Sequence, residues 1–226
     1  MSNPSVPSGP SSPSGPGDPS DPSGPSAPSG QDPAPSAGRQ RLFVAVLPPA
    51  PAVEELRAAV APLHRLPGAR QLRWTGPEGW HFTLAFLGEV DGALLPELYG
   101  RLERAAHRSE PFPLRVHGGG RFDGRVLWAG AAGGLDALRL LAERAHAAAC
   151  RSGVPMEEHR RYTPHLTLAR SRTEVELSPF TEALAGFGGT GWRADTLSLV
   201  RSDLPVSGVP GEQPRYRVVG AWPLGR

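Results

Sequence analysis

Two short strings of this sequence carry the same pair of polar side chains in the same order. His81 is followed two positions later by Thr83, and His165 is followed two positions later by Thr167. Both pairs lie in apolar, β-forming runs, and residues i and i+2 of a strand point to the same face. Each string therefore predicts one imidazole and one hydroxyl side by side. On the opposite face we expect the apolar neighbours Phe82, Leu84, Phe86, Leu166 and Leu168.

The repetition of this pair predicts a site with approximate two-fold symmetry, in which two imidazoles approach one substrate from opposite sides. Imidazole titrates near neutral pH, so one ring can accept a proton while the other donates one. Displacement at a phosphorus atom needs both steps, because the attacking water loses a proton and the departing oxygen gains one. Thr83 and Thr167 would donate hydrogen bonds to oxygens of such a substrate. A pattern this symmetric leaves open which histidine is the base and which is the acid.

Two other interpretations of the histidine pair have less support. A pair of core histidines satisfied by their neighbours would not require a threonine beside each ring. A catalytic metal site usually needs three protein ligands, and no carboxylate stands at equivalent spacing in the two strings. The sequence therefore predicts neither a metal nor another cofactor.

The segments around the two strings alternate between strand and helix patterns. Helices are predicted at residues 51–63, 91–107 and 135–151, and the glycine-rich residues 118–124 are predicted to form a loop. Strands are predicted at 42–47, 71–75, 80–87, 112–117, 126–131, 162–169, 192–201 and 216–222. This order, with its internal duplication, favours an α+β fold. Two similar lobes with antiparallel sheets would flank a central cleft, related by a pseudo-two-fold axis.

Composition divides the chain into two parts. Residues 1–38 are rich in Ser, Pro and Gly and hold almost no large apolar side chain, so we expect a disordered tail that is neither a secretory signal nor a membrane anchor. Residues 39–226 are long enough for one domain with a sizeable core. No run of about 18 apolar residues is present, so no membrane span is predicted. A cytoplasmic protein is the default expectation.

The basic residues and the cysteine limit the chemistry. All 24 basic residues are arginine. A Walker-type phosphate loop and a lysyl-nucleotide ligase each need a lysine, so both classes are excluded. Arginine is a good planar, bidentate partner for phosphate, although a bias across the whole chain also fits genome composition. Cys150 is the one cysteine, which excludes an intrachain disulfide, and we expect it to be buried in a helix.

The longer strings around the two pairs resemble the 2H phosphoesterases, and within them the bacterial and archaeal RNA 2′,3′-cyclic phosphodiesterases, once called 2′-5′ RNA ligases. The second signature includes Pro164 before its histidine and Arg170 after it. The resemblance covers nearly all of residues 41–222. The matching strings lie at 41–46, 72–74, 80–88, 118–122, 126–128, 162–170, 199–202 and 216–222.

This resemblance implies hydrolysis of RNA 2′,3′-cyclic phosphate ends to 2′-phosphates, with no metal, by paired histidines. RNA ends or cyclic nucleotides are then the substrates. It also implies that Arg170 contacts the phosphate. Arg170 lies at an odd offset from His165, so a regular strand would turn it away; a bulge or a strand end is required there, and the resemblance implies one. Two alternatives stay open: ligation through a 2′-5′ linkage as a side activity, and a nucleotide-binding module without turnover.

Further residues are candidates for contact with RNA. Phe43 and Phe122 could stack on a nucleobase, as aromatic side chains do in proteins that bind single strands. Arg160 and Arg161 form a small basic cluster that either contacts phosphates or lies on a solvated face. Since the cleft needs only one chain, we expect a monomer.

Overall fold

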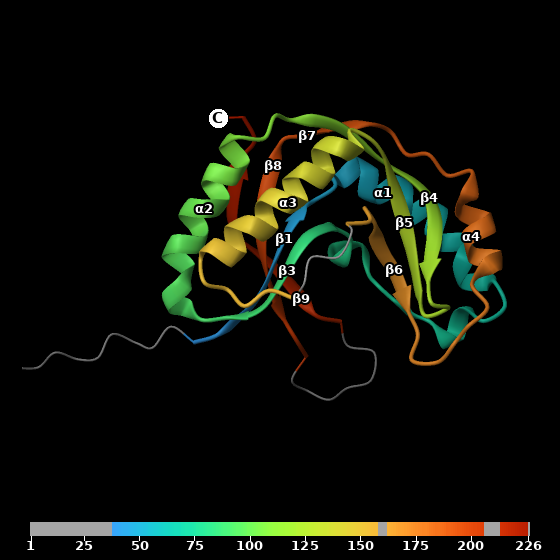
Figure 1. The fold of residues 1–226 in the computed structure, drawn as a ribbon. Coiled ribbons are helices and arrows are strands. Elements are labelled where there is room, and N and C mark those ends of the chain that lie inside the picture. The colour runs from blue at the N-terminus through green and yellow to red at the C-terminus, as the bar shows by residue number, and fades with distance from the viewer. Residues whose placement is uncertain (1–37, 158–161, 206–212, 226) are drawn as a thin grey trace, which may run out of the picture. The chain divides into compact units, whose positions relative to one another are not determined.

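In the computed structural model of this protein, which describes residues 38–157, 162–205 and 213–225, the strands form two antiparallel sheets (Figure 1). The first sheet has the order β3–β1–β8–β9, with β1 at Gln40–Val46, β3 at Phe82–Val90, β8 at Thr196–Asp203 and β9 at Arg215–Pro223. The second sheet has the order β2–β6–β5–β4–β7. Its strands are β2 at Arg73–Trp74, β4 at Phe112–Phe122, β5 at Val126–Gly133, β6 at Leu166–Arg170 and β7 at Trp192–Ala194.

The helices tie the two sheets together. Helix α1 (Ala50–Val60) follows β1 of the first sheet but packs against β4 of the second, and α3 (Leu135–Arg151) follows β5 of the second sheet but packs against β3 of the first. Helix α2 (Leu95–His107) packs on α3 and β9, and α4 (Ser178–Ala185) packs on β4 (Figure 1). Short 3₁₀ helices occupy Ala61–Arg65, Ala69–Gln71, Pro77–Gly79 and Gly92–Leu94.

The main helices form where the sequence supplies an apolar stripe. On α2 the residues facing the core are Leu98, Leu102, Ala105 and Ala106, a spacing of about one turn. The carboxylate of Asp91 accepts a hydrogen bond from the Ala93 backbone N–H and so caps the 3₁₀ turn that leads into this helix. None of the helices within the described residues is both long and apolar enough to cross a membrane.

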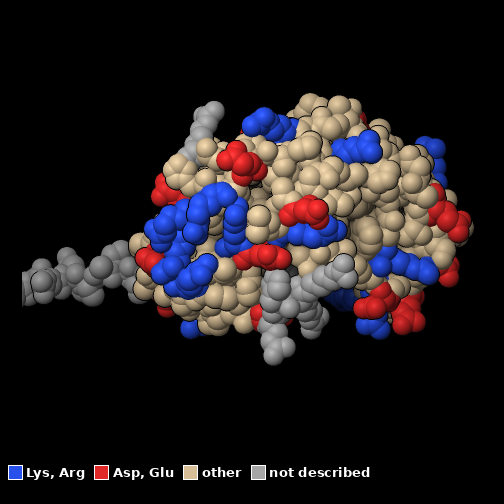
Figure 2. Space-filling view, turned by 45° about the horizontal axis from the view of Figure 1, so that its top comes forward, with Lys and Arg blue, Asp and Glu red and all other residues tan. Residues whose placement is uncertain are grey.

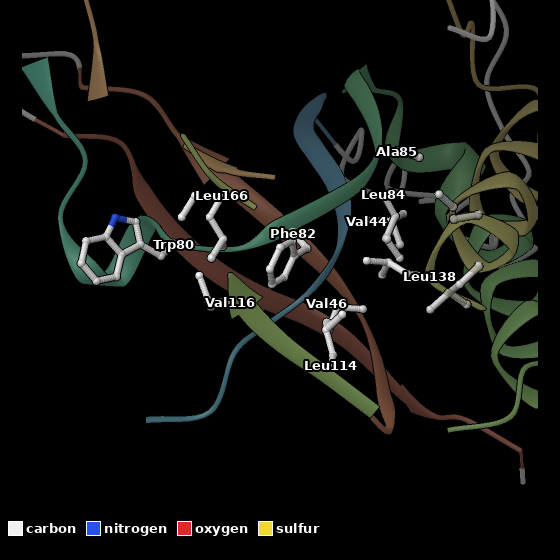
Figure 3. Packing of buried hydrophobic residues seen from close by; sticks show 14 of the residues in the cluster. Val44, Val46, Trp80, Phe82, Leu84, Ala85, Leu114, Val116, Leu138 and Leu166 are labelled. Carbon is white, nitrogen blue, oxygen red and sulfur yellow. The ribbon is translucent and has the colours of Figure 1, made fainter. Parts of the chain in front are cut away.

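The main core lies between the sheets and under the helices (Figure 3), and a smaller separate cluster holds Phe43, Ala45 and Val200. Phe82 and Leu84, which alternate with the polar residues of β3, are both buried in the main core. Complete burial of a side chain of this size contributes about 1.5–3 kcal/mol. The apolar face of β3 thus anchors the strand, and its opposite face is left to Thr83 and, just before the strand, to His81. The α+β fold with two antiparallel sheets, predicted from the sequence, is confirmed.

Several predicted boundaries are wrong. The strand predicted at 162–169 begins only at Leu166, as β6. The glycine run at 118–120 belongs to β4 rather than to a loop, because the glycines make room for large neighbours. A Cβ at Gly120 would lie 2.1 Å from the Trp128 ring, and one at Gly119 would lie 2.7 Å from Leu184 of α4. The single strand predicted at 192–201 is two strands, β7 and β8, which pair in different sheets on either side of Asp195.

Two side chains also differ from expectation. Phe86 is 52% exposed instead of lying on the apolar face, and the Arg41 guanidinium lies 4.7 Å from its ring centroid. Cys150 is exposed, because it falls outside the buried stripe of α3. Helix α4 was not predicted from the sequence. Most of the expected tail, residues 1–37, and the basic pair Arg160 and Arg161 lie outside the described residues.

Candidate active site

A cavity of about 100 Å³ brings together the polar residues of both repeated strings. His81 and Thr83 reach it from the first sheet, and His165, Thr167 and Arg170 reach it from the second. The remaining lining residues are Thr75, Gly79 and Tyr216. Residues from the two sheets and from the segment between β2 and β3 therefore place two imidazoles, four hydroxyls and one guanidinium around one small space.

The same β-bulge occurs in both histidine strands. On β3, Ala85 and Thr83 pair with the adjacent residues Val44 and Ala45 of β1, so Leu84 between them is the extra residue. On β6, Ala169 and Thr167 pair with the adjacent residues Leu127 and Trp128 of β5, so Leu168 is the extra residue. Leu84 and Leu168 are 84 positions apart in the sequence, as are His81 and His165. The internal duplication thus extends to a backbone irregularity.

The bulge of β6 explains how Arg170 reaches the cavity. An extra residue shifts the alternation of a strand by one position. The third residue after Thr167 therefore returns to the side of the histidine, where the sequence spacing alone would turn it away. There the Arg170 Nη2 donates to Thr167 Oγ1 at 3.3 Å. Phe86 occupies the equivalent position of β3, so it is exposed and outside the core.

One hydrogen bond determines the tautomer of His165. Its Nδ1 lies 2.7 Å from the carbonyl oxygen of Thr163. A carbonyl can only accept, so Nδ1 carries a proton and Nε2 is the free nitrogen of the neutral ring. Burial lowers the pKa of His165, the Thr163 bond opposes this change, and the charge of Arg170 adds to it. The edge of Phe122 packs against the ring, with centroids 5.0 Å apart.

His81 has an apolar environment instead. Its ring stacks on Phe43 with centroids 4.4 Å apart, and Tyr216 meets it edge-on at 5.3 Å. Burial is the main cause that lowers the pKa of His81 to about 4, and the charges of His165 and Arg170 add to it. Both histidines are therefore neutral at neutral pH when the cavity holds no anion.

The two aromatic candidates have different surroundings. Phe43 is only 3% exposed, and His81 and Tyr216 cover its ring, so the prediction that it stacks on a nucleobase is wrong. The reason is its place on a central strand whose two faces are both covered. Phe122 is half-buried against His165 and Trp128 and does not line the cavity. Its contact with a base stays a prediction.

Sequence reasoning assigned no site role to Tyr216, Thr75 or Gly79. Tyr216 comes from β9, near the end of the chain, and burial raises its pKa, so its hydroxyl keeps its proton. A Cβ at Gly79 would lie 2.7 Å from Thr75 Cγ2 and 3.2 Å from the Tyr216 ring. The one available signal was the resemblance of the closing strands to a known family, which includes Tyr216.

A larger groove of about 840 Å³ adjoins the cavity and shares Thr75, Arg170 and Tyr216 with it. Arg70, Arg73 and Arg172 also line this groove, and no described carboxylate does. It gives an anion bound at the histidines a basic surface along which the rest of a larger molecule can extend.

The chemistry of this donor set suits a phosphate. Two imidazoles can exchange protons with a reacting centre, and hydroxyls with an arginine can hold its non-bridging oxygens. Within residues 38–157, 162–205 and 213–225, no three His, Cys, Asp or Glu side chains gather in a group that could hold a metal ion.

The sequence of this chain is similar to those of known phosphoesterases. The family model "LigT like Phosphoesterase" matches residues 46–128 and 131–210. The RNA 2′,3′-cyclic phosphodiesterase of Geobacillus stearothermophilus is 29% identical over 158 residues, which is 67% of this chain and 47% of that protein. The enzyme of the same name from Aquifex aeolicus is 29% identical over 105 residues, which is 45% of this chain and 56% of that protein. The chain therefore spans about half the length of these curated relatives.

Solved structures resemble the chain over a greater length. LigT of E. coli in its apo form has a TM-score of 0.66 and 27% identity, with 84% of this chain and 99% of that chain covered. A structure of the same E. coli protein complexed with 3′-AMP has a TM-score of 0.64, at the same identity and coverage.

Proposed function

Because the chain belongs to the LigT-like phosphoesterase family, we propose that it hydrolyses the 2′,3′-cyclic phosphate ends of RNA to 2′-phosphates. The observation that carries this proposal is that His81, Thr83, His165, Thr167 and Arg170 line the same cavity. Curated relatives named RNA 2′,3′-cyclic phosphodiesterase support the substrate class. One chain supplies every residue of the site, so in this proposal the protein acts as a cytoplasmic monomer without a metal or other cofactor.

The reaction is an in-line displacement at phosphorus. Water attacks from one side while the bond to the ribose O3′ breaks on the other, which opens the five-membered ring and leaves the phosphate on O2′. One histidine accepts the proton of the water and the other donates a proton to O3′. Each such transfer contributes about 10²–10⁴-fold in rate. Thr83, Thr167 and Arg170 donate hydrogen bonds to the non-bridging oxygens, where negative charge develops.

The surroundings of the two rings favour His81 as the base and His165 as the acid. His81 lies between two aromatic rings, an environment that disfavours its charged form. The Nδ1–H of His165 is bound to the Thr163 carbonyl, which stabilises the protonated ring. A proton on its Nε2 would then be available to the departing oxygen.

The groove beside the cavity fits the rest of the substrate. Its volume of about 840 Å³ has room for a nucleoside, and the basic side chains of Arg70 and Arg172 offer partners to a preceding phosphate. The complex of E. coli LigT with 3′-AMP shows a nucleotide bound by a member of the fold. In our proposal the terminal ribose lies at the cavity and the RNA extends along the groove.

Hydrolysis of a 2′,3′-cyclic mononucleotide in excess EDTA tests the proposal directly. We expect turnover with a 2′-phosphate as the product, identified by phosphorus NMR. A 3′-phosphate product would contradict the direction of ring opening. Loss of activity in EDTA that returns with a divalent metal would show that a metal takes part. Nucleotide binding without turnover would favour the binding-module alternative.

A further inference from the structure

Five arginine side chains meet in a shallow furrow between α2 and α3, which shares no residue with the candidate active site. Figure 2 shows basic side chains gathered on the side of the molecule that carries α2 in Figure 1. The furrow holds about 40 Å³, so it is open and shallow rather than enclosing. Its basic residues are Arg101, Arg104, Arg108, Arg144 and Arg151.

Small residues form the floor of this furrow and the arginines form its sides. Ala105 of α2 and Ala148 of α3 are both buried at its base. Arg101, Arg104 and Arg108 recur at intervals of three and four along α2 and its C-cap, and Arg144 and Arg151 are seven positions apart on α3. Such spacings place side chains on one side of a helix. Seven residues of helix span about 10 Å, so the furrow presents two facing rows of guanidinium groups of that length.

Few carboxylates neutralise this charge. Glu97 lies 2.7 Å from Arg101 Nε and 3.9 Å from Arg104, so one carboxylate serves two arginines. In the part of the chain that the structure describes, no carboxylate pairs with Arg108, Arg144 or Arg151.

Backbone and hydroxyl oxygens hold two of these three arginines. Arg108 Nε donates to the carbonyl of Arg104, and Arg144 donates to Ser109 Oγ and to the carbonyl of Arg108. The C-terminal end of α2 accounts for about half a negative charge. A positive excess remains, held in place and without an anionic partner among the described residues.

We propose that this furrow binds the phosphodiester backbone of RNA, as a second contact surface separate from the reaction cavity. The inference rests on the proposed function, which makes RNA the substrate. Guanidinium groups pair with phosphate oxygens in a planar, bidentate geometry. Two rows about 10 Å long can contact two or three consecutive phosphates of a strand. An open furrow of this size suits a strand laid across it better than a free nucleotide, which needs an enclosing pocket.

The test is RNA binding by the double variant Arg104→Ala/Arg151→Ala, which removes one arginine from each helix. The probe is a 12-nucleotide RNA with a 3′-hydroxyl, so binding is measured without any reaction. We expect the Kd near 100 mM salt to rise on the order of tenfold. The slope of log K against log[salt] should become shallower by about 1.4, since each single-strand phosphate contact contributes about 0.7. Turnover of a 2′,3′-cyclic mononucleotide should match the wild type, which also reports on folding.

The matched control is Arg57→Ala/Arg139→Ala, which removes the same charge from two exposed arginines that pair with Glu54 and Asp136. RNA affinity unchanged in the furrow variant, or reduced equally in the control, would overturn the proposal. An equal loss of affinity for a trinucleotide and for the 12-mer would also overturn it, because a single small anion would then suffice. Loss of binding to phosphatidylserine vesicles alone would assign the furrow to a membrane surface instead. Failure of the wild type to hydrolyse cyclic nucleotides would contradict the proposed function and leave this binding measurement interpretable.

Discussion

Strands β3 and β6 have the same local backbone geometry, but the histidines that precede them have different surroundings. Each strand begins directly after a histidine, has a threonine as its second residue, and has a bulge at the next residue, Leu84 or Leu168. His165 has a backbone carbonyl on its Nδ1, whereas His81 is packed between Phe43 and Tyr216. The strand geometry is therefore symmetric while the electrostatic environment is not.

The third position after each threonine also differs between the two strands. On β6 this position is Arg170, which lines the cavity and donates to Thr167 Oγ1. On β3 it is Phe86, exposed and covered in part by the guanidinium of Arg41. A duplicated backbone can thus present two similar bases while its unmatched side chains give them different tasks. The following predictions test how far that difference extends.

The largest expected effect is the loss of either imidazole. His81→Ala and His165→Ala should each lower kcat for a 2′,3′-cyclic nucleotide by about 10²–10⁴-fold, because each removes one proton transfer. Steady-state kinetics measure this, with product binding checked by calorimetry. His117→Ala, which removes an exposed histidine outside the cavity, is the control and should keep wild-type turnover.

A substrate with a good leaving group then separates the two roles. The nitrophenolate released from bis(p-nitrophenyl) phosphate needs no proton, so a general acid contributes little to that reaction. His165→Ala should keep most of its activity on this ester, and His81→Ala should stay impaired. Equal losses on the ester would contradict the assignment of His81 as base and His165 as acid.

The second effect is on stability in acid. The pKa of His81 is about 4 in the folded protein and 6.5 for an unperturbed histidine, so between these pH values the unfolded chain binds more protons. The contribution of His81 to the free energy of unfolding is therefore fully present above pH 6.5 and falls by about 3 kcal/mol as the pH drops to 4. Urea unfolding at pH 7 and pH 4 should show a smaller drop for His81→Gln than for the wild type.

His165→Gln is the matched comparison for that measurement. The hydrogen bond of His165 to Thr163 opposes the lowering of the His165 pKa. We therefore expect His165→Gln to change the acid sensitivity of unfolding less than His81→Gln does. A larger change for His165→Gln than for His81→Gln would reverse the comparison between the two environments.

The smallest of these effects concerns the unmatched position. Arg170→Ala should lower kcat/KM by about 10–100-fold, the equivalent of a charged hydrogen bond of about 1.5–3 kcal/mol. Phe86→Ala, at the equivalent position of β3, should leave kcat/KM unchanged because Phe86 does not line the cavity. Similar losses in both variants would mean that the two halves of the site are more alike than the structure indicates.

Much of the fold and several site residues could be predicted from local patterns in the sequence. The alternation around His81 and His165 predicted strands with polar and apolar faces, and the helix at 135–151 was predicted with the bounds it has. These features depend on neighbours a few residues away, since strand and helix periodicities repeat every two and 3.6 residues. The loop predicted over the glycine run of β4 was wrong because the large partner of these glycines, Trp128, lies on the next strand.

The tertiary structure decided what depends on partners distant in the sequence. Whether Arg170 faces the cavity depends on a bulge, which exists only as a register between β5 and β6. Phe43 lost its predicted role because His81 and Tyr216 cover it, and Tyr216 arrives from a strand more than 170 positions away. The sequence alone determined which side chains are available and which of them share a strand face. Strand pairing and burial, which arise only when the whole chain packs, determined which of those side chains meet at one cavity.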